Sequence, residues 1–450
     1  MIEKILNDVK DVIWSPALVV ILVLAGLYFS IRTRFVQVRK IRTMLKLLFA
    51  KREKSGKGVS SFQAFCLALS GRVGTGNIVG VATAIALGGP GAIFWMWIIA
   101  FLGASTAYVE STLSQLYKFK HKSGYRGGPF CYIEQGLKCK WLAIIFALVT
   151  ILGLGIFSPP VQSNGVAMAA NNVFNIPLWV TGLITASVLA FVIIGGVKRI
   201  ASFAEVITPI MAIMYILLSL VIVVINWRQV PHVFSMIIQG AFGFSQFGGG
   251  ILGSTISMGV KRGLYSNEAG EGSGAIVSAS ADVKCPEHQG LVQAFSVYID
   301  TLLVCSATAF MILSTGMYNV FDPNTGEALL DNEFGHNYVE YTQTAVDTLI
   351  PGFGSWFVCI ALFFFAFTTI IAYYFYAETS IIYLTQNNKR MEKVMIWVYR
   401  FVILAMVILG SVQTADAAWA LGDIGIGLTT WINIIVILIL APQAIKLIRK

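Results

Sequence analysis

Charged residues are scarce in this chain of 450 residues. Asp, Glu, Lys and Arg together make up 12% of it, while 57% of its residues are hydrophobic. A typical soluble domain has about 25% charged residues. A soluble fold of this size cannot hide so much apolar surface and still present a charged exterior, so soluble proteins are excluded. Disordered proteins are excluded for the same reason.

Cysteine and histidine are also sparse, with 6 and 4 residues. So few cysteines exclude a secreted disulfide scaffold, and we expect no disulfides. The histidines are too scattered for a metal site, and no Walker A, Gly-x-Ser-x-Gly or His-Glu-x-x-His motif occurs. These absences argue against an ATP-driven pump and against common membrane hydrolases. Transport coupled to an ion gradient is left as the main interpretation.

Long apolar runs, in contrast, are abundant, and a spanning helix needs about 20 mostly apolar residues. We therefore expect an all-α polytopic membrane protein with eleven transmembrane helices. The expected spans are 12–31, 61–87, 90–116, 141–174, 178–196, 203–226, 234–259, 288–316, 352–384, 394–411 and 418–443.

The net charge of +10 is distributed unevenly over the loops between these spans. Segment 32–58 holds ten Lys and Arg and segment 117–140 holds six, whereas 317–351 holds none and carries six acidic residues. Cytoplasmic loops are enriched in Lys and Arg, so we expect a multi-pass protein of the cell membrane with its N-terminus outside and its C-terminus in the cytoplasm. Nucleic acid is not needed to explain the charge, although anionic lipid headgroups gain from the same basic patches.

Without the first span, ten spans remain, and two five-span units in opposite orientations would form an inverted repeat, as in many transporters. We expect a single transmembrane domain over 1–450. It divides into an N-terminal extra helix with its basic loop (1–58), a first repeat (59–226) and a second repeat (234–450).

Glycine-rich runs at 70–77 and 240–250 interrupt the first helix of each half at a similar depth. Each Gly costs about 1 kcal/mol relative to Ala inside a helix, so these runs predict two broken helices. Half-helix N-termini suit a carboxylate and half-helix C-termini suit Na⁺. The alternative is that the glycines serve only for close helix packing.

Arg72 and Asp300 both fall near the middle of expected spans, where an isolated charge is costly. We expect them to form an ion pair with a structural or gating role, and proton carriage is the alternative. Glu268, Glu271 and Glu378 are alternative partners for Arg72.

Other polar side chains in the spans have two interpretations each. Thr368 and Thr369 lie in an aromatic stretch, where their hydroxyls could bond back to the helix or bind a cation. Gln162 and Asn164 follow two prolines, where their amides could satisfy freed carbonyls or bind a solute.

The segment from Gly88 to Gly103, with its glycine-rich start and Phe-Trp-Met-Trp core, resembles the signature of the alanine or glycine:cation symporter family. Segments 70–77, 161–164 and 263–270 are similar to that family as well, and the resemblance covers nearly the whole chain. It implies a leucine-transporter-type fold of the amino acid-polyamine-cation superfamily. It also implies cotransport of L- or D-alanine or glycine with Na⁺, or with H⁺ in some members, by alternating access and without an organic cofactor.

The resemblance also implies roles for individual residues, with core helices 1 and 6 broken. The Thr75 and Gly76 amides would hold the substrate carboxylate. The other expected substrate-binding residues are Asn77, Gln162, Phe242, Gly243, Phe244, Ser245 and Gln246. Na⁺ would bind the hydroxyls of Thr368 and Thr369 and the carbonyls of Ser70 and Val73, with Gly71 and Gly74 as alternatives for the carbonyls.

Three alternatives stay open at this stage. The chain could be a proton-coupled or broader small-amino-acid permease of the same fold. It could be a channel or facilitator, because glycine-rich broken helices also occur in selectivity filters. A membrane enzyme is the third class, and we do not favour it because no nucleophile–base pair is recognisable. We expect a monomer, because each bundle of this type contains its own site.

Overall fold

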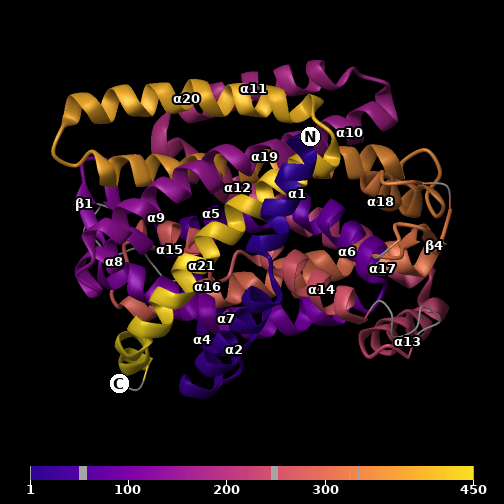
Figure 1. The fold of residues 1–450 in the computed structure, drawn as a ribbon, viewed down its shortest axis with the longest axis horizontal. Coiled ribbons are helices and arrows are strands. Elements are labelled where there is room, and N and C mark those ends of the chain that lie inside the picture. The colour runs from indigo at the N-terminus through magenta and orange to yellow at the C-terminus, as the bar shows by residue number, and fades with distance from the viewer. Residues whose placement is uncertain (1, 50–57, 245–251, 324, 333, 449–450) are drawn as a thin grey trace.

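Almost every segment of the chain is helical (Figure 1). The computed structural model describes residues 2–49, 58–244, 252–323, 325–332 and 334–448. The N-terminal elements are α1 (Ile2–Ile13), α2 (Pro16–Arg32), α3 (Val36–Arg39), α4 (Ile41–Leu48), α5 (Ser61–Arg72), the π-helix η1 (Gly76–Gly80), α6 (Val81–Gly88) and α7 (Ala92–Leu116).

The middle of the chain begins with a short antiparallel hairpin, in which β1 (Phe119–His121) pairs with β2 (Gly124–Arg126). It continues through α8 (Pro129–Gly136), α9 (Lys140–Leu152), the π-helix η2 (Gly153–Phe157), α10 (Pro159–Phe174), α11 (Leu178–Ile194), α12 (Gly196–Ile225), η3 (Trp227–Gln229) and α13 (Val230–Ala241).

The C-terminal elements are α14 (Leu252–Asn267), α15 (Ser273–Ala279), α16 (Pro286–Val297), the π-helix η5 (Tyr298–Cys305), α17 (Ser306–Thr315), β3 (Val320–Phe321), β4 (Ala328–Leu330), α18 (Tyr338–Asp347), α19 (Gly354–Leu384), α20 (Lys389–Val412) and α21 (Ala415–Ile448). The strands β3 and β4 form a second antiparallel pair.

Eight helices in the described residues are long and apolar enough to cross a membrane, and a bent pair raises the number to nine. The expected span 178–196 corresponds to α11, which has only 17 residues. The expected span 234–259 is divided between α13 and α14, and residues 245–251 between them lie outside the described part of the chain. The structure therefore supports a polytopic helical membrane protein, and the count of eleven stays a prediction.

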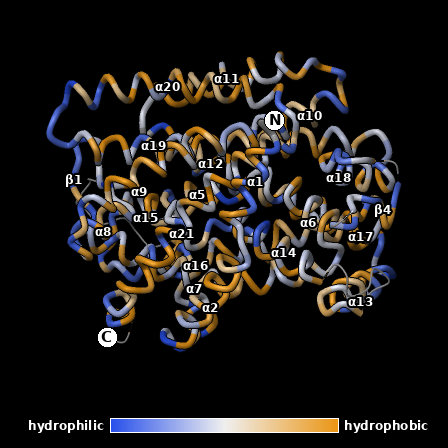
Figure 2. Tube along the Cα trace, in the orientation of Figure 1, coloured by the Kyte–Doolittle hydropathy of each residue, from blue (hydrophilic) through white to orange (hydrophobic). Residues whose placement is uncertain are grey.

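The polar connections gather at the two ends of the long axis of the molecule. Figure 2 shows hydrophilic segments around β1 and α8 at one end and around β4 and α18 at the other. The basic segment 117–140 and the acidic segment 317–351 thus lie at opposite ends (Figure 1). Between the ends, α11, α12 and α20 expose large apolar side chains such as Phe191, Val206 and Phe401, as expected of helices that face lipid.

The helix break predicted at 70–77 is present. Helix α5 begins with a capping box, in which Ser60 Oγ accepts a hydrogen bond from Gln63 N and Gln63 Oε1 accepts one from Ser60 N. The helix ends at Arg72, and the chain resumes as η1 at Gly76 with a bend of 50°. Backbone groups freed at this bend face protein, because residues 70–77 are all buried.

Candidate functional site

The break between α5 and η1 brings backbone oxygens toward one side chain of α19. Thr369 Oγ1 lies 2.9 Å from the Ser70 carbonyl oxygen, 3.4 Å from that of Val73 and 2.9 Å from that of Phe365. A hydroxyl has one proton and can donate to only one of these oxygens at a time. The remaining oxygens lie around the same hydroxyl, and oxygen atoms are the ligands that hard cations prefer.

Thr368 lies differently from its neighbour. Its hydroxyl lies 3.0 Å from the Phe365 carbonyl oxygen in the same helix and 3.8 Å from Met211 Sδ. The structure therefore brings together Thr369, Ser70 and Val73, which were predicted from the sequence. It places the Thr368 hydroxyl in contacts with α19 and α12 instead.

Gly74 is required by the close approach of α19 and α10 to the break. A Cβ atom at this position would lie 2.4 Å from Thr369 Oγ1 and 2.9 Å from Gln162 Oε1. Neither Gly71 nor Gly74 supplies a carbonyl to Thr369 among the bonds of the described residues, so the register with Ser70 and Val73 fits this structure.

One of the two amides predicted to hold a carboxylate, that of Thr75, is already bonded to a side-chain oxygen, and so is the neighbouring amide of Gly74, which was not predicted. Thr75 N donates to Gln162 Oε1 at 2.9 Å, and Gly74 N donates to Asn77 Oδ1 at 2.8 Å. Gln162 therefore reaches the break from α10. Asn164, two residues on, donates instead to the Gly410 and Gln413 carbonyls, so it fastens α10 to the end of α20.

Asn77 joins the break to η5. Its Nδ2 donates to Asp300 Oδ1 at 2.6 Å, and Ser266 and Thr301 donate their hydroxyl protons to the same carboxylate at 2.8 and 2.7 Å. Three neutral donors thus satisfy a carboxylate that is fully buried.

The predicted ion pair between Arg72 and Asp300 is not present in the described residues. Arg72 Nε donates to the Asn267 carbonyl at 2.6 Å, and its Nη1 donates to Gln293 Oε1 at 3.1 Å and to Ser296 Oγ. The two charges face different neighbours, because Arg72 points toward α16 and the end of α14 while Asp300 points toward Asn77. Arg72 therefore ties α5 to these helices.

Three further buried carboxylates lie near Arg72, although none of them forms an ion pair with it within 4.0 Å in the described part of the chain. Glu268 accepts hydrogen bonds from Ser273 Oγ at 2.9 Å and Tyr376 OH at 3.0 Å, and Glu110 accepts one from Asn433 Nδ2 at 3.0 Å. Among the described residues, neither carboxylate oxygen of Glu271 has a hydrogen-bond partner.

Three further buried polar atoms of these side chains have no hydrogen-bond partner among the described residues. They are Arg72 Nη2, Glu110 Oε1 and Glu268 Oε1, and a Cβ at Gly274 would meet both Arg72 Nη2 and Glu110 Oε1 within 3.5 Å. We call Arg72, Glu110, Glu268 and Glu271 the carboxylate cluster. Glu378, the third partner considered for Arg72, pairs with Arg126 at 3.1 Å instead.

Sequence reasoning missed Glu110 and Tyr265. Glu110 is a single acid in the long apolar helix α7, and that isolation was the available signal. Tyr265 packs beside the break, because a Cβ at Gly76 would lie 3.1 Å from its ring. Its ring lies 4.8 Å from that of Trp419, and nothing in the residue pattern marks it.

The second predicted break is only partly described. Helix α13 ends at Ala241, and Gly243 has the left-handed φ of +78° that favours glycine. Phe242 packs on Phe94 and Phe244 is 78% exposed, so neither ring encloses the break at 73–75 in this structure. Ser245 and Gln246 lie outside the described residues.

Three possible metal ligands occur in one short segment at the start of α16. One ligand atom each of Cys285, Glu287 and His288 lies within 4.8 Å of the others, and all three residues are half-buried. His288 was discounted from the sequence because the histidines are scattered, yet its neighbours along the chain supply the other donors. Three donors fall short of the four that a structural zinc site uses.

The family model described as the sodium:alanine symporter family matches residues 1–450. The chain belongs to this family. Its members are transporters rather than enzymes, so the enzyme alternative is excluded.

Relatives within the sodium:alanine symporter family cover almost the whole chain. The putative sodium/proton-dependent alanine carrier protein YrbD of Bacillus subtilis is 53% identical over 98% of this chain and 91% of that protein. The sodium/proton-dependent alanine carrier protein of Bacillus sp. strain PS3 is 48% identical over 87% and 88%. The sodium/alanine symporter AgcS of Methanococcus maripaludis is 35% identical over 98% and 96%.

Solved structures with a similar fold include a manganese transporter. The crystal structure of the Eremococcus coleocola manganese transporter, with a bound aromatic bis-isothiourea compound, superposes with a TM-score of 0.57 over 86% of this chain and 78% of that one. The identity is 14%, so this likeness concerns the fold alone.

Proposed function

We propose that this protein is a secondary active transporter that carries alanine or glycine together with Na⁺ by alternating access. The observation that carries the proposal is the group of oxygens around Thr369 at a helix break, because such oxygens suit a dehydrated monovalent cation. The names of the relatives, a putative sodium/proton-dependent alanine carrier and a sodium/alanine symporter, support the same cargo.

The proposed Na⁺ site consists of Thr369 Oγ1 and the carbonyl oxygens of Ser70 and Val73, with Thr368 as the further ligand implied by the family resemblance. These ligands are neutral. A Na⁺ ion among them adds a full positive charge beside the Thr75 and Gly76 amides. That charge favours a carboxylate at the amides, so ion and substrate bind better together than apart.

The proposed substrate site begins at the Thr75 amide. In this structure Gln162 Oε1 accepts the Thr75 N–H as a carboxylate oxygen of an amino acid would. Thr75, Asn77 and Gln162 are all almost fully buried, so the site is closed to solvent in this structure. Gln162 would turn away from Thr75 when the substrate arrives, and residues 242–246 would cover the opposite face of the substrate.

We further propose a leucine-transporter-type core with eleven spans and a five-plus-five inverted repeat, working as a monomer in the cell membrane. The bent pair α5–η1–α6 supports the first broken helix, and the end of α13 at Ala241, followed by Gly243 in the left-handed region, falls where the second is expected. The basic and acidic segments at opposite ends of the molecule support an external N-terminus and a cytoplasmic C-terminus.

Uptake of labelled alanine into proteoliposomes tests the proposal. We expect an inward Na⁺ gradient to concentrate alanine inside, and glycine to compete better than any larger amino acid in a panel of twenty. Equal alanine uptake with and without the Na⁺ gradient would exclude Na⁺ coupling. Flux that never exceeds equilibrium would instead indicate a facilitator.

Proton coupling is the second candidate, and the carboxylate cluster favours it. Three buried carboxylates lie near one guanidinium, so their formal charge is balanced only when two protons or other monovalent cations join them. We expect a Glu271→Gln variant to retain uptake driven by a Na⁺ gradient and to lose any uptake driven by a pH gradient alone. Glu287→Gln, on the half-buried start of α16, is the matched control.

A further inference from the structure

A basic cavity lies away from the proposed transport site, where the β1–β2 hairpin meets the last turns of α19 and the first turns of α20 (Figure 1). Its volume is about 290 Å³. The cavity lies at the edge of the membrane, because α19 ends at Leu384 and the spanning helix α20 begins at Lys389.

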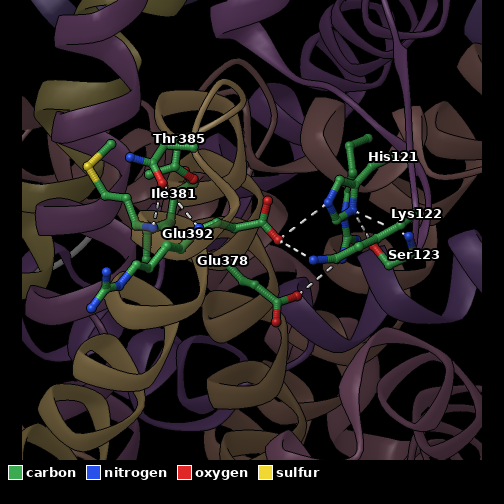
Figure 3. A network of polar contacts seen from close by, with 11 residues as sticks. His121, Lys122, Ser123, Glu378, Ile381, Thr385 and Glu392 are labelled. Atoms are coloured by element: carbon green, nitrogen blue, oxygen red, sulfur yellow. Dashed lines mark hydrogen bonds and ion pairs between the residues drawn. The ribbon is translucent and has the colours of Figure 1, made fainter.

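Part of the charge around this cavity is paired. Figure 3 shows His121 and Lys122 of the hairpin pointing toward the carboxylate of Glu392, at 3.5 and 2.8 Å. Arg126 pairs with Glu378 at 3.1 Å. Glu378 and Glu392 are the carboxylates among the lining residues, and both are committed to these hairpin cations.

Three other cations line the cavity, and among the described residues none has a carboxylate within 4.0 Å. They are Lys389, Lys393 and Arg400. Arg126 is 1% exposed, and its Nε has no hydrogen-bond partner. The lining therefore carries three positive charges more than its carboxylates balance, with histidine neutral, and includes an unsatisfied buried donor.

The far wall of the cavity is apolar and continues onto the lipid-facing side of α20. Ile382, Ile396 and Trp397 line it, and Val394, Val398 and Phe401 beside them are exposed. A ligand with a compact anionic group and an attached apolar part would match both walls. Lys and Arg clusters at a membrane edge bind phosphate groups in this way.

We propose that this cavity binds a phosphate-bearing anion, held by Lys389, Lys393, Arg400 and Arg126. The anion is either the headgroup of an acidic membrane lipid or a free phosphate, and the shared chemistry is the tetrahedral dianionic or monoanionic phosphate. The bound group would bridge the hairpin, through Arg126, and α20, through the other three side chains. The proposal does not depend on which solute the protein transports.

Native mass spectrometry of the full-length protein tests this proposal. The protein is released from nanodiscs of phosphatidylcholine with or without phosphatidylglycerol, and retained lipid is counted. We expect the wild type to retain phosphatidylglycerol, and Lys389→Gln/Lys393→Gln to retain about thirtyfold less, from roughly fivefold for each lysine at a membrane surface. Lys389→Arg/Lys393→Arg should retain it as the wild type does.

Lys120→Gln/Lys140→Gln is the matched control, because both lysines are exposed near the same end of the molecule and neither lines the cavity. An equal loss of retained phosphatidylglycerol in this control and in the cavity variant would show that the lipid is attracted by surface charge in general. That result would overturn the proposal. Unchanged retention in the cavity variant would overturn it too.

Titration with inorganic phosphate in lipid-free detergent separates the two sources. Phosphate binding that the cavity variant loses indicates a site for free phosphate, whereas retention of phosphatidylglycerol without phosphate binding indicates a headgroup site. Binding of neither probe contradicts the proposal. Equal unfolding temperatures of the variants in phosphatidylcholine alone exclude a loss that comes from misfolding.

Discussion

Two polar regions meet at the end of α5. One of them consists of neutral groups and the other of charged side chains. The break at 73–75 gathers carbonyl oxygens, amide hydrogens, one hydroxyl and two carboxamides, none of which carries a formal charge. The carboxylate cluster lies on the other side of Arg72 and holds four formally charged side chains. Neutral oxygens can take up and release a monovalent ion at modest cost, whereas carboxylates bind protons as well as cations. This difference is the reason why we propose the break for Na⁺ and substrate, and the cluster for stability or proton binding.

Removal of the Arg72 guanidinium should have the largest effect. Arg72→Ala leaves three buried carboxylates without a positive charge, and breaking such buried charge balance costs about 3–5 kcal/mol. We expect a large fall in the unfolding temperature of the purified protein. Arg72→Lys keeps the charge and should recover part of the loss. An unfolding temperature unchanged in Arg72→Ala would show that the cluster is not held by this charge.

A methyl group at Gly74 should impair transport, because it crowds the neutral break at 73–75, and it should leave the fold intact. The added Cβ would lie 2.4 Å from Thr369 Oγ1, and such overpacking costs about 1–3 kcal/mol. We expect Gly74→Ala to reduce sodium-driven alanine uptake by roughly tenfold to a hundredfold. Gly80→Ala is the control, because its nearest neighbour would lie at an ordinary 3.5 Å. Similar uptake in both variants would contradict the proposed crowding at the break.

A carboxylate placed in the neutral region should compete with the substrate. Gln162→Glu offers a charged oxygen to the Thr75 amide, and charge-assisted hydrogen bonds are about twice as strong as neutral ones. We expect the KM for alanine to rise about tenfold. Asn164→Asp is the control on the same helix, since Asn164 contacts Gly410 and Gln413 rather than the break. A KM that rises only in the control would place the substrate elsewhere.

The contact between His121 of the β1–β2 hairpin and Glu392 gives the smallest predicted effect. It lies outside the two buried regions compared above. Burial, together with the charges of Arg126 and Lys122, lowers the pKa of His121, and Glu392 opposes this. A lowered pKa means that His121 contributes stability above its ordinary pKa, and that this contribution is lost as the pH falls through the folded value. We expect lower protection factors, which are corrected for the intrinsic pH dependence of amide exchange, in 119–126 at pH 5.5 than at pH 7.5. Equal protection factors at both pH values in His121→Gln would support this assignment, and a pH dependence of the protection factors that survives in the variant would exclude it.

The sequence predicted the parts of the site that lie along one helix better than the contacts between helices. Three glycines within 71–76 predicted the break at the right place, because backbone preference is a local property. The sequence also indicated that Arg72 and Asp300 lie at a similar depth in the membrane, and this similarity suggested that they form a pair. The direction in which each side chain points depends on helix rotation. The π-helix that contains Asp300 changes that rotation without any mark in the apolar pattern.

The two adjacent threonines show the same limit. Both lie in one apolar stretch of α19, and residue type gives them equal claims as cation ligands. Only the packing of α19 against α5 separates them, by turning Thr369 toward Ser70 and leaving Thr368 beside Met211. Glu110 was missed for a related reason, because its partners come from distant parts of the chain.

The Na⁺ concentration that gives half-maximal alanine uptake tests the central claim most directly. It should be measured in proteoliposomes for the wild type, Thr369→Ala and Thr368→Ala. Loss of an oxygen that faces the Ser70 and Val73 carbonyls predicts an increase of about tenfold in Thr369→Ala, and a smaller change in Thr368→Ala. An unchanged Na⁺ dependence in Thr369→Ala would contradict a cation site at this helix break.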